Sequence, residues 1–405
     1  MIGRLFFLSL FFFSYASANI LQDAIDRAPL GATIKLPAGN YMGSIVINKP
    51  LSIIAKEEGV RIDGENSGRV ITINSSDVTL KNLIITNSGN RMDNLDSAIF
   101  INGVKRVTIG HCKLLNSLYG IDMKMVEDSL IEGNYISSKN VDVTLRGDAL
   151  KIWYSHNNRI KNNTIEKTRD VTLTYSHNNI LENNTFLHNR FATHISLSKN
   201  NVLKANHYKY NSVAIMLMGV KDTKILKNSI NSSTGAAGIG VVLKGTKNLL
   251  FENNVVRYNA EGLFVDAKAT EEGMQRYIKD NDISYNKEAI HFHAVIQNNT
   301  IRHNRFVGNI DDIVKDTEGA LTRRNTVEKN YWDRYSGFDK NRDNIGDSPH
   351  QIYQHADQLW HYNPKVKFFY GSPLMTLLNF MSELAPFVAP VLLLEDTKPL
   401  VHNPD

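Results

Sequence analysis

The chain repeats itself along most of its length, and this repeat limits the folds open to it. The segment SHNNRIKNNT, residues 155–164, returns as SHNNILENNT, residues 176–185, at an interval of 21. Related segments can be aligned on the second asparagine of each doublet, at Asn134, Asn163, Asn184, Asn206, Asn228, Asn254 and Asn281. Their spacings of 29, 21, 22, 22, 26 and 27 residues give a base period near 22, with loops inserted into some repeats. A period of this size predicts a solenoid.

Each repeat contains short strands rather than helices. VTLTY, VAIMLM and VVLKG are strands of this kind, and no 3.6-residue period accompanies them. We therefore predict an all-β fold, a right-handed parallel β-helix whose coils stack about 4.8 Å apart. Asparagine tolerates a left-handed φ, and its amide can bond the amide of the next coil. The doublets, together with His156 and His177 at one turn position, are therefore predicted to be structural.

The two ends differ from the repeats. Residues 20–28, ILQDAIDRA, place apolar residues on one helical face and are expected to cap the first coil. The repeat stops near Asn330, and we expect the later tail to form an amphipathic helix from about Pro373 to Leu384 and then an extended Pro-rich arm. The predicted organisation is a signal peptide at 1–18, an N-terminal cap at 19–45, the β-helix at 46–330, an acidic loop region at 331–363 and an apolar C-terminal arm at 364–405.

The first residues indicate export. Arg4 precedes an apolar run from Leu5 to Phe13, and the small residues Ala16 to Ala18 follow, which predicts a signal peptide cleaved after Ala18. The alternative is a retained N-terminal anchor, although the apolar run is too short to span a bilayer. Cys112 is the one cysteine of the chain, so no internal disulfide can form. The net charge of +5 is mild, and no basic block with interleaved aromatic residues predicts nucleic-acid binding.

Three later segments carry a resemblance to a known family. The segment Arg146 to Leu150 (RGDAL), the loop from Trp332 to Pro349 and the tail from Ser372 to Pro399 resemble the NosD family. This resemblance implies a periplasmic, non-enzymatic protein attached to an ABC-type membrane permease, which a cytoplasmic ATPase drives. It also implies that the complex supplies copper for the maturation of nitrous oxide reductase and receives it from a copper chaperone lipoprotein. The C-terminal arm would then dock on the permease and give a peripheral membrane association.

The residues themselves offer one good candidate for a copper site. Cu(I) prefers thioether and thiolate donors and accepts imidazole, and the chain has ten methionines and thirteen histidines. His194 and Met216 each stand 12 residues before a reference asparagine, so we expect them to be stacked neighbours. Met218 lies two positions further along the strand and therefore on the same face. Polar residues in these columns favour an outward face. The alternative is an apolar patch under a loop or partner.

Two weaker metal candidates compete with it. His291 and His293 place two imidazoles on one face of a strand, a second copper candidate for which the sequence indicates no third ligand. The loop DKNRDNIGD has oxygen side chains at positions typical of Ca²⁺ loops, although Asn344 replaces the usual glycine and His350 the usual glutamate. Calcium there competes with a solvated turn, and its ligands would be Asp339, Asn341, Asp343 and Asp347.

The main alternative is a secreted enzyme that acts on polysaccharides. Parallel β-helices often carry such lyases, epimerases and hydrolases, which need clustered carboxylates beside basic residues. The register brings one such group together, namely Asp142, Arg146, Asp148, Arg169 and Asp170. The Asp-Pro-His-Asp and Gly-His-Gly signatures of known sugar-acting families are absent. We expect Arg146 and Asp148 instead to form an ion pair that orders an inserted loop. A passive scaffold that binds partners without metal is a third alternative.

Overall fold

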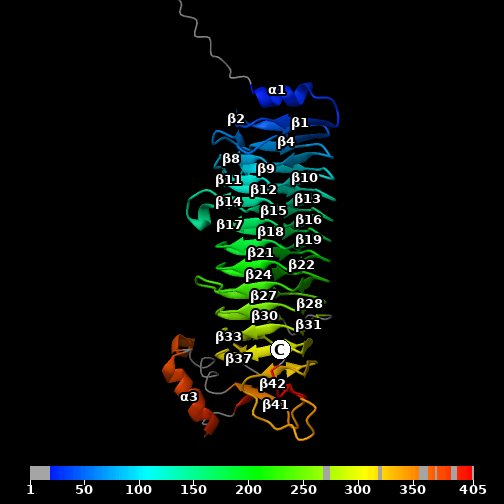
Figure 1. The fold of residues 1–405 in the computed structure, drawn as a ribbon. Helices are drawn as coiled ribbons and strands as arrows, with labels where there is room; N and C mark the ends of the chain where they lie inside the picture. The colour runs from blue at the N-terminus through cyan, green and yellow to red at the C-terminus, as the bar shows by residue number, and fades with distance from the viewer. Residues whose placement is uncertain are drawn as a thin grey trace, which may run out of the picture.

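The chain winds into a long parallel β-solenoid. The computed structural model describes residues 19–267, 274–317, 322–354, 364–369, 372–384 and 390–403, so the predicted signal peptide lies outside the described residues. Figure 1 shows the coils stacked in one column, with helix α1 (Ile20–Arg27) across the N-terminal end and the C-terminal segments gathered at the other. The predicted all-β parallel solenoid is confirmed, with about 13 turns. Its right-handed winding stays a prediction.

Three long sheets form the walls of the solenoid, and each strand pairs in parallel with its equivalent in the next coil. The first sheet has 13 strands: β1 (Ala32–Leu36), β4 (Leu51–Ala55), β7 (Thr79–Lys81), β10 (Thr108–Gly110), β13 (Leu130–Glu132), β16 (Arg159–Lys161), β19 (Ile180–Glu182), β22 (Val202–Lys204), β25 (Lys224–Leu226), β28 (Leu249–Glu252), β31 (Arg276–Lys279), β35 (Asn299–Arg302) and β39 (Thr326–Glu328). The second also has 13: β2 (Gly39–Met42), β5 (Val60–Asp63), β8 (Ile84–Thr86), β11 (Lys113–Ser117), β14 (Tyr135–Ser138), β17 (Thr164–Glu166), β20 (Thr185–Leu187), β23 (His207–Lys209), β26 (Ser229–Asn231), β29 (Val255–Arg257), β32 (Asp282–Ser284), β36 (Arg305–Val307) and β40 (Tyr331–Trp332). The third has 12: β3 (Ile45–Ile47), β6 (Ile71–Ile73), β9 (Ser97–Asn102), β12 (Tyr119–Lys124), β15 (Leu150–Trp153), β18 (Asp170–Thr174), β21 (Phe191–Ser196), β24 (Val213–Met218), β27 (Ile239–Lys244), β30 (Glu261–Ala267), β33 (Glu288–Ala294) and β37 (Asp311–Lys315).

The core fills the inside of the coils. Alternate strand residues point inward because side chains alternate across a strand, and those residues form columns of isoleucine, leucine and valine. Met123, Ile152 and Leu173 are one such column, each at most 1% exposed. Near the C-terminal end a core column of the second sheet becomes aromatic, and the rings of Phe306 and Trp332 stack with centroids 4.1 Å apart. Helix α1 adds Leu21 and Ile25 to the core and so covers the apolar interior of the first coil.

The two residues of each asparagine doublet have different structural roles. The first residue takes the left-handed turn conformation, as at Asn162 with φ of 57° and Asn183 with φ of 53°. The second is buried, and its amides bind the next coil: Asn163 donates from its backbone N and its Nδ2 to Oδ1 of Asn184, at 3.0 Å each. The same bonds link the reference asparagines, in the order Asn134, Asn163, Asn184, Asn206, Asn228, Asn254, Asn281, Asn304 and Asn330. This asparagine ladder is the feature that the repeat encodes.

The stacked histidines of the turn belong to the same scaffold. The rings of His156 and His177 lie 4.9 Å apart and nearly parallel. Nδ1 of His156 accepts a hydrogen bond from the backbone N of His177 at 3.0 Å, and Nδ1 of His177 accepts one from Lys199 at 3.1 Å. These bonds use the lone pair that a neutral imidazole would offer a metal, which supports the structural interpretation.

The C-terminal segments close the open end of the solenoid. Strand β41 (His350–Gln354) is followed by the 3-10 helix η3 (Pro364–Phe369), helix α3 (Pro373–Leu384) and strand β42 (Val391–Asp396). Helix α3 has the predicted bounds. The segment expected to be an extended arm is instead part of the fold, because β42 pairs antiparallel with β41 and buries Leu393 and Leu394 against the last coil. Within the described ranges, no helix is long and apolar enough to cross a membrane.

Asp396 of β42 ends the asparagine ladder. Its fully buried carboxylate accepts the backbone N and Nδ2 of Asn330, at 3.0 and 2.9 Å, and Nε1 of Trp332 at 3.0 Å. It therefore occupies the place that the asparagine of a further coil would take. A carboxylate offers only acceptors, so the ladder stops with no unpaired donor at its end.

Replacing Asp396 with alanine is expected to destabilise the C-terminal coils by about 3 kcal/mol, because buried donors of Asn330 and Trp332 lose a charged acceptor. Urea unfolding and hydrogen exchange of the Asn330 amide measure the change. Glu395→Ala, which removes only the exposed bond from Gln351 at 2.7 Å, is the control and should change stability little. Equal effects of the two substitutions would contradict this role for Asp396.

Candidate metal centres

The structure places the predicted copper residues side by side. Strand β21 pairs with β24 so that His194 lies opposite Met216, and Met218 follows two positions along the strand. Ile215 and Leu217, between and beside the methionines, are fully buried, so His194, Met216 and Met218 point outward from the third sheet and are half-buried. The predicted register and the predicted outward face are confirmed. That these residues bind copper stays a prediction.

The imidazole of His194 has an unused polar atom. Its Nε2 is buried and has no hydrogen-bond partner among the described residues, and its ring packs edge-on against Phe191 with centroids 5.8 Å apart. Burial lowers the pKa of His194 below 6.5; the charge of Asp170 opposes this shift, and that of Arg190 adds to it. The imidazole is therefore neutral at neutral pH and keeps one lone pair. A buried polar atom without a partner is costly, and this one belongs to the register neighbour of Met216.

The neighbouring coils limit how many ligands this site could offer. One coil further on, Met216 lies beside Val242 and Met218 beside Lys244. On the other side of His194 lies Thr172. None of these is a soft donor, so a metal here would have at most one imidazole and two thioethers. Thioether side chains are flexible enough to close on an ion, and a small soft donor set of this kind suits Cu(I).

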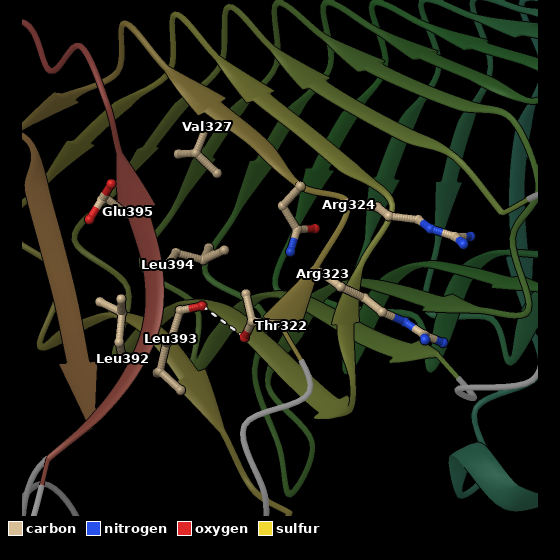
Figure 2. A pocket seen from close by; sticks show the side chains of 9 residues that line it. Thr322, Arg323, Arg324, Val327, Leu392, Leu393, Leu394 and Glu395 are labelled. Carbon is tan, nitrogen blue, oxygen red and sulfur yellow. Dashed lines mark hydrogen bonds between the residues drawn. The ribbon is translucent and has the colours of Figure 1, made fainter.

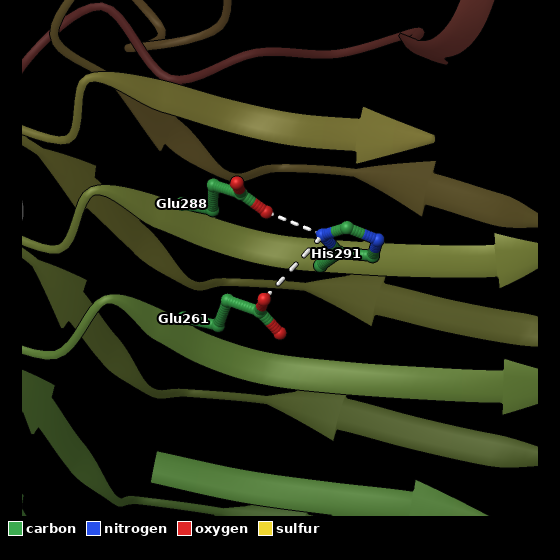
Figure 3. A group of neighbouring side chains, drawn as sticks. All are labelled: Glu261, Glu288 and His291. Carbon is green, nitrogen blue, oxygen red and sulfur yellow. Dashed lines mark hydrogen bonds and ion pairs between the residues drawn. The ribbon is translucent and has the colours of Figure 1, made fainter. Parts of the chain in front are cut away.

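The second predicted pair lies in a different environment. His291 of β33 is only 2% exposed, and its Nδ1 contacts Glu288 and lies 3.9 Å from Oε1 of Glu261 (Figure 3). Its Nε2 lies 3.3 Å from Oδ2 of Asp316. The half-exposed His293 places Nδ1 2.9 Å from the other oxygen of Asp316. The five side chains form one cluster, which we call the acidic histidine cluster.

Sequence reasoning missed the three carboxylates of this cluster, although the repeat contained a signal for them. Glu261 and Glu288 each stand seven residues after a ladder asparagine, and the register pairs them in adjacent coils. His293 and Asp316 each stand 12 residues after one. A constant offset from the ladder predicts a shared column, and applying it to carboxylates as well as to soft donors would have found the group.

Electrostatics makes His291 a charged group. Burial lowers its pKa, but the carboxylates of Asp316 and Glu288 outweigh burial and raise the pKa to about 9. Burial raises the pKa of Asp316, but the hydrogen bonds from His291 and His293 outweigh burial and lower that pKa to about 2. At neutral pH His291 is therefore an imidazolium, with no lone pair for Cu(I). The donor atoms of Glu261, Glu288 and His291 lie within 4.8 Å of one another, a set that suits a harder ion only after that proton leaves.

The predicted calcium loop is held together by its own carboxylates. Asp339 accepts the backbone N of Asp343 at 3.2 Å and of Asn344 at 2.9 Å, and Asp347 accepts that of Lys340 at 2.8 Å. The side chain of Asn341 donates to Asp343 at 3.0 Å. These bonds account for the acidic residues as parts of a tight turn. Calcium binding at this loop stays a prediction.

The charged group considered for an enzyme is a chain of ion pairs. Asp148 pairs with Arg169 at 3.1 Å, Arg169 lies 3.5 Å from Asp170, and Arg190 binds Asp170 with its Nε at 3.0 Å. The expected pair of Arg146 with Asp148 is wrong. Arg146 instead donates to the carbonyls of residues 141 and 167, at 2.8 and 2.9 Å. The reason is the 21-residue coil, which stacks residue 169 directly on residue 148.

A cavity of about 420 Å³ lies at the C-terminal end, between β42 and the strands β38 (Thr322–Arg323) and β39. Leucines of β42 line one side, and the Thr322 hydroxyl donates to the Leu393 carbonyl at 3.1 Å (Figure 2). Arg323 and Arg324 point away from those leucines. The cavity lies several coils from His194, so it has no part in the candidate copper site.

Comparison with known proteins settles the family. Residues 132–337 match the family described as "Periplasmic copper-binding protein (NosD)". The chain belongs to the NosD family. It is 26% identical over 411 residues to the "Probable ABC transporter binding protein NosD" of Pseudomonas aeruginosa, covering 96% of the chain and 93% of that relative. The protein of the same description from Stutzerimonas stutzeri is 24% identical over 385 residues, 91% of the chain and 87% of the relative. The match to NosD spans the segment that includes His194, Met216 and Met218.

Solved structures share the solenoid but little sequence. The A-module of the mannuronan C-5 epimerase AlgE6 from Azotobacter vinelandii superposes with a TM-score of 0.55 at 13% identity, over 77% of this chain and 93% of that module. The catalytic domain of a GH87 α-1,3-glucanase superposes with a TM-score of 0.52 at 14% identity, over 74% of this chain and 64% of that one. At this identity the likeness establishes the fold alone.

The acidic histidine cluster predicts that stability falls in mild alkali. The folded pKa of His291, about 9, exceeds the ordinary value of 6.5, so its contribution is complete below pH 6.5 and disappears as the pH rises through 9. The loss should be about 3 kcal/mol. Urea unfolding across this range measures it, and His291→Gln should flatten the dependence. His303→Gln, at an exposed site 3.7 Å from Asp280, should not. A pH-independent stability of the wild type would contradict the assignment.

Proposed function

We propose that this chain is the periplasmic, non-enzymatic binding component of an ABC-type transporter that delivers copper for the maturation of nitrous oxide reductase. Membership of a family described as periplasmic and copper-binding supports this, as do full-length relatives named as transporter binding proteins. The single observation that carries it within the chain is the buried, unbonded Nε2 of His194, a residue that the register pairs with Met216 of the next coil. Export by a cleaved signal peptide, residues 1–18, is part of the proposal.

His194, Met216 and Met218 would hold Cu(I) transiently. The imidazole supplies one nitrogen donor, and the thioethers supply two soft sulfur donors. The site is half-buried on the outer face of a rigid sheet, so an ion bound there stays accessible to a second protein. A low coordination number permits an incoming ligand to bind before the outgoing ligand leaves. His291 and His293 are the weaker copper candidates, because the imidazolium of His291 must first lose a proton.

Helix α3 is the proposed contact with the membrane permease, which a cytoplasmic ATPase would drive. Met375 is buried, whereas Leu374, Leu377, Phe380, Met381 and Leu384 are between 51% and 72% exposed. An exposed apolar face of this kind marks a contact with a protein or a membrane. Figure 1 places α3 beside the C-terminal end of the solenoid, away from the coils that carry His194. The proposed copper donor, a chaperone lipoprotein, and the acceptor, nitrous oxide reductase, would therefore have the solenoid wall free for docking.

No observation favours the alternative of a polysaccharide lyase, epimerase or hydrolase. The acidic residues Asp148 and Asp170 that it would need are engaged by Arg169 and Arg190. The superposed enzymes agree with this chain in fold only. Calcium at Asp339, Asn341, Asp343 and Asp347 is retained as a prediction independent of the copper proposal.

The double substitution Met216→Ala/Met218→Ala should weaken Cu(I) binding by about 100-fold, because it removes two of three donors. His194→Gln should weaken it as well. Competition with a chromogenic Cu(I) chelator, using the purified mature chain, measures the affinity. Met125→Ala is the matched control, since Met125 is 47% exposed but lies outside the His194 column. Full Cu(I) affinity in the double variant would reject this site.

Introducing a charge into the exposed face of α3 should detach the chain from the transporter. Phe380→Glu is expected to weaken co-purification with the membrane permease by about tenfold or more, since an aromatic side chain that the contact would bury becomes charged. Phe338→Glu is the control, because Phe338 is also exposed, at 76%, but lies outside α3, in the loop between β40 and β41. Equal retention of both variants on the transporter would reject α3 as the contact.

A further inference from the structure

The excess of positive over negative charge in the chain is concentrated in a few coils. Residues 199–247 contain eight lysines and one acidic residue, Asp222, a balance of +7, whereas the whole chain carries +5. Every one of these lysines is exposed. The same coils contain Met216 and Met218, so the candidate copper site lies inside a positively charged belt.

Three of the lysines stack in one column. Lys199, Lys221 and Lys247 face one another in successive coils through isolated parallel bridges. Lys244 extends the group, because the register places it beside Met218 on the outward face of the third sheet. Lys221 stands three residues after Met218, across the glycine turn that ends β24. We call Lys199, Lys221, Lys244 and Lys247 the lysine edge.

At several other positions the solenoid pairs opposite charges across adjacent coils. Earlier in the same column, Lys105 contacts Glu127 at 2.6 Å. In the first sheet Lys161 contacts Glu132 at 2.8 Å, and Arg302 contacts Glu328 at 2.8 Å. These pairs follow from the stacking, which brings the same position of neighbouring coils together.

Lys199, Lys221 and Lys247 of the lysine edge depart from this pattern, whereas Lys244 follows it. Lys244 reaches Asp266 at 3.0 Å and Lys221 lies 3.8 Å from Asp222, but Lys199 and Lys247 have no ion pair among the described residues. Like charges directly opposite one another on adjacent strands repel and destabilise a sheet. Among the described residues no carboxylate stands opposite these three lysines, so the column presents its positive charge to solvent.

We infer that the lysine edge is the docking surface for an acidic protein, which exchanges Cu(I) with the site of His194, Met216 and Met218; this inference rests on the proposed function. Charge complementarity identifies the partner as one whose metal site is ringed by aspartate and glutamate. The geometry also fits the transfer, because a ligand must come within bonding distance of Met218 to take the ion, and Lys244 is its register neighbour. Opposite charge on the partner would raise the rate of encounter and orient the two sites.

Two synthetic peptides test the inference. Both carry the same methionine and histidine donors for Cu(I), flanked by glutamates in one and by glutamines in the other. Cu(I) transfer from the loaded chain to the glutamate peptide should be about tenfold faster at low salt, and the difference should disappear when salt shortens the screening length to about 3 Å. Fluorescence anisotropy of the glutamate peptide with the copper-free chain measures docking alone.

The chain offers a matched pair of variants. Lys199→Gln/Lys221→Gln/Lys247→Gln should abolish the preference for the glutamate peptide. Lys204→Gln/Lys224→Gln/Lys227→Gln removes the same charge from the first sheet and its following turn, and should keep the preference. Cu(I) affinity should be unchanged in both, since neither touches a donor.

Three outcomes would overturn the inference. Equal losses in the two triple variants would show that the whole belt acts through its net charge. Absence of glutamate-peptide docking by the wild type would reject an acidic protein partner. Stronger binding of the edge to phosphatidylglycerol vesicles than to the peptide would identify a membrane surface instead.

Failure of the chain to load Cu(I), with docking intact, would reject the proposed function and leave the docking surface standing.

Discussion

The in-register stacking of identical coils is the constraint on which the rest of this structure depends. Backbone hydrogen bonds join each strand to the same strand of the next coil, and the asparagine ladder repeats that link in the interior of the turn. A shift of one residue would reverse every side chain between core and surface, so the buried columns and the ladder hold a single register. Chemistry on the surface is consequently arranged in columns. His194 meets Met216, and Lys199 meets Lys221, because each pair occupies one position of neighbouring coils.

A stack of this kind has two open ends, and the chain closes them differently. Helix α1 covers the first coil with apolar contacts from Leu21 and Ile25. At the other end a strand far along the chain folds back, and its Asp396 takes the acceptor position of the missing next coil. The end that carries the charged acceptor is also the end beside α3 (Figure 1). Closure of the solenoid and presentation of the apolar helix are thus achieved by one C-terminal segment.

His194 and His291 show how the surroundings of a histidine decide whether it can bind a metal. His194 is half-buried, the opposite charges of Asp170 and Arg190 act on it in opposite directions, and its imidazole stays neutral with one nitrogen unbonded. His291 is surrounded by carboxylates and is held as a cation. Both occupy the same outward column of the third sheet, four coils apart. Only His194 can offer a soft metal a lone pair without first losing a proton. The description of the family as copper-binding agrees with a site of that kind.

The sequence by itself determined the solenoid, the outward strand faces, the partners of His194 and the bounds of helix α3. These features follow from short-range periodicity, because the spacing of a repeat or of an apolar face can be read directly along the sequence. The stacking of Arg169 on Asp148 and of carboxylates around His291 was contained in the same register, although sequence reasoning did not apply the register to them. Only the tertiary structure decided that Asp396 would end the ladder, that Nε2 of His194 would be left without a partner, and that His291 would be held as a cation. Asp396 reaches the ladder by a returning chain, and the states of the two imidazoles depend on burial, which no local pattern records.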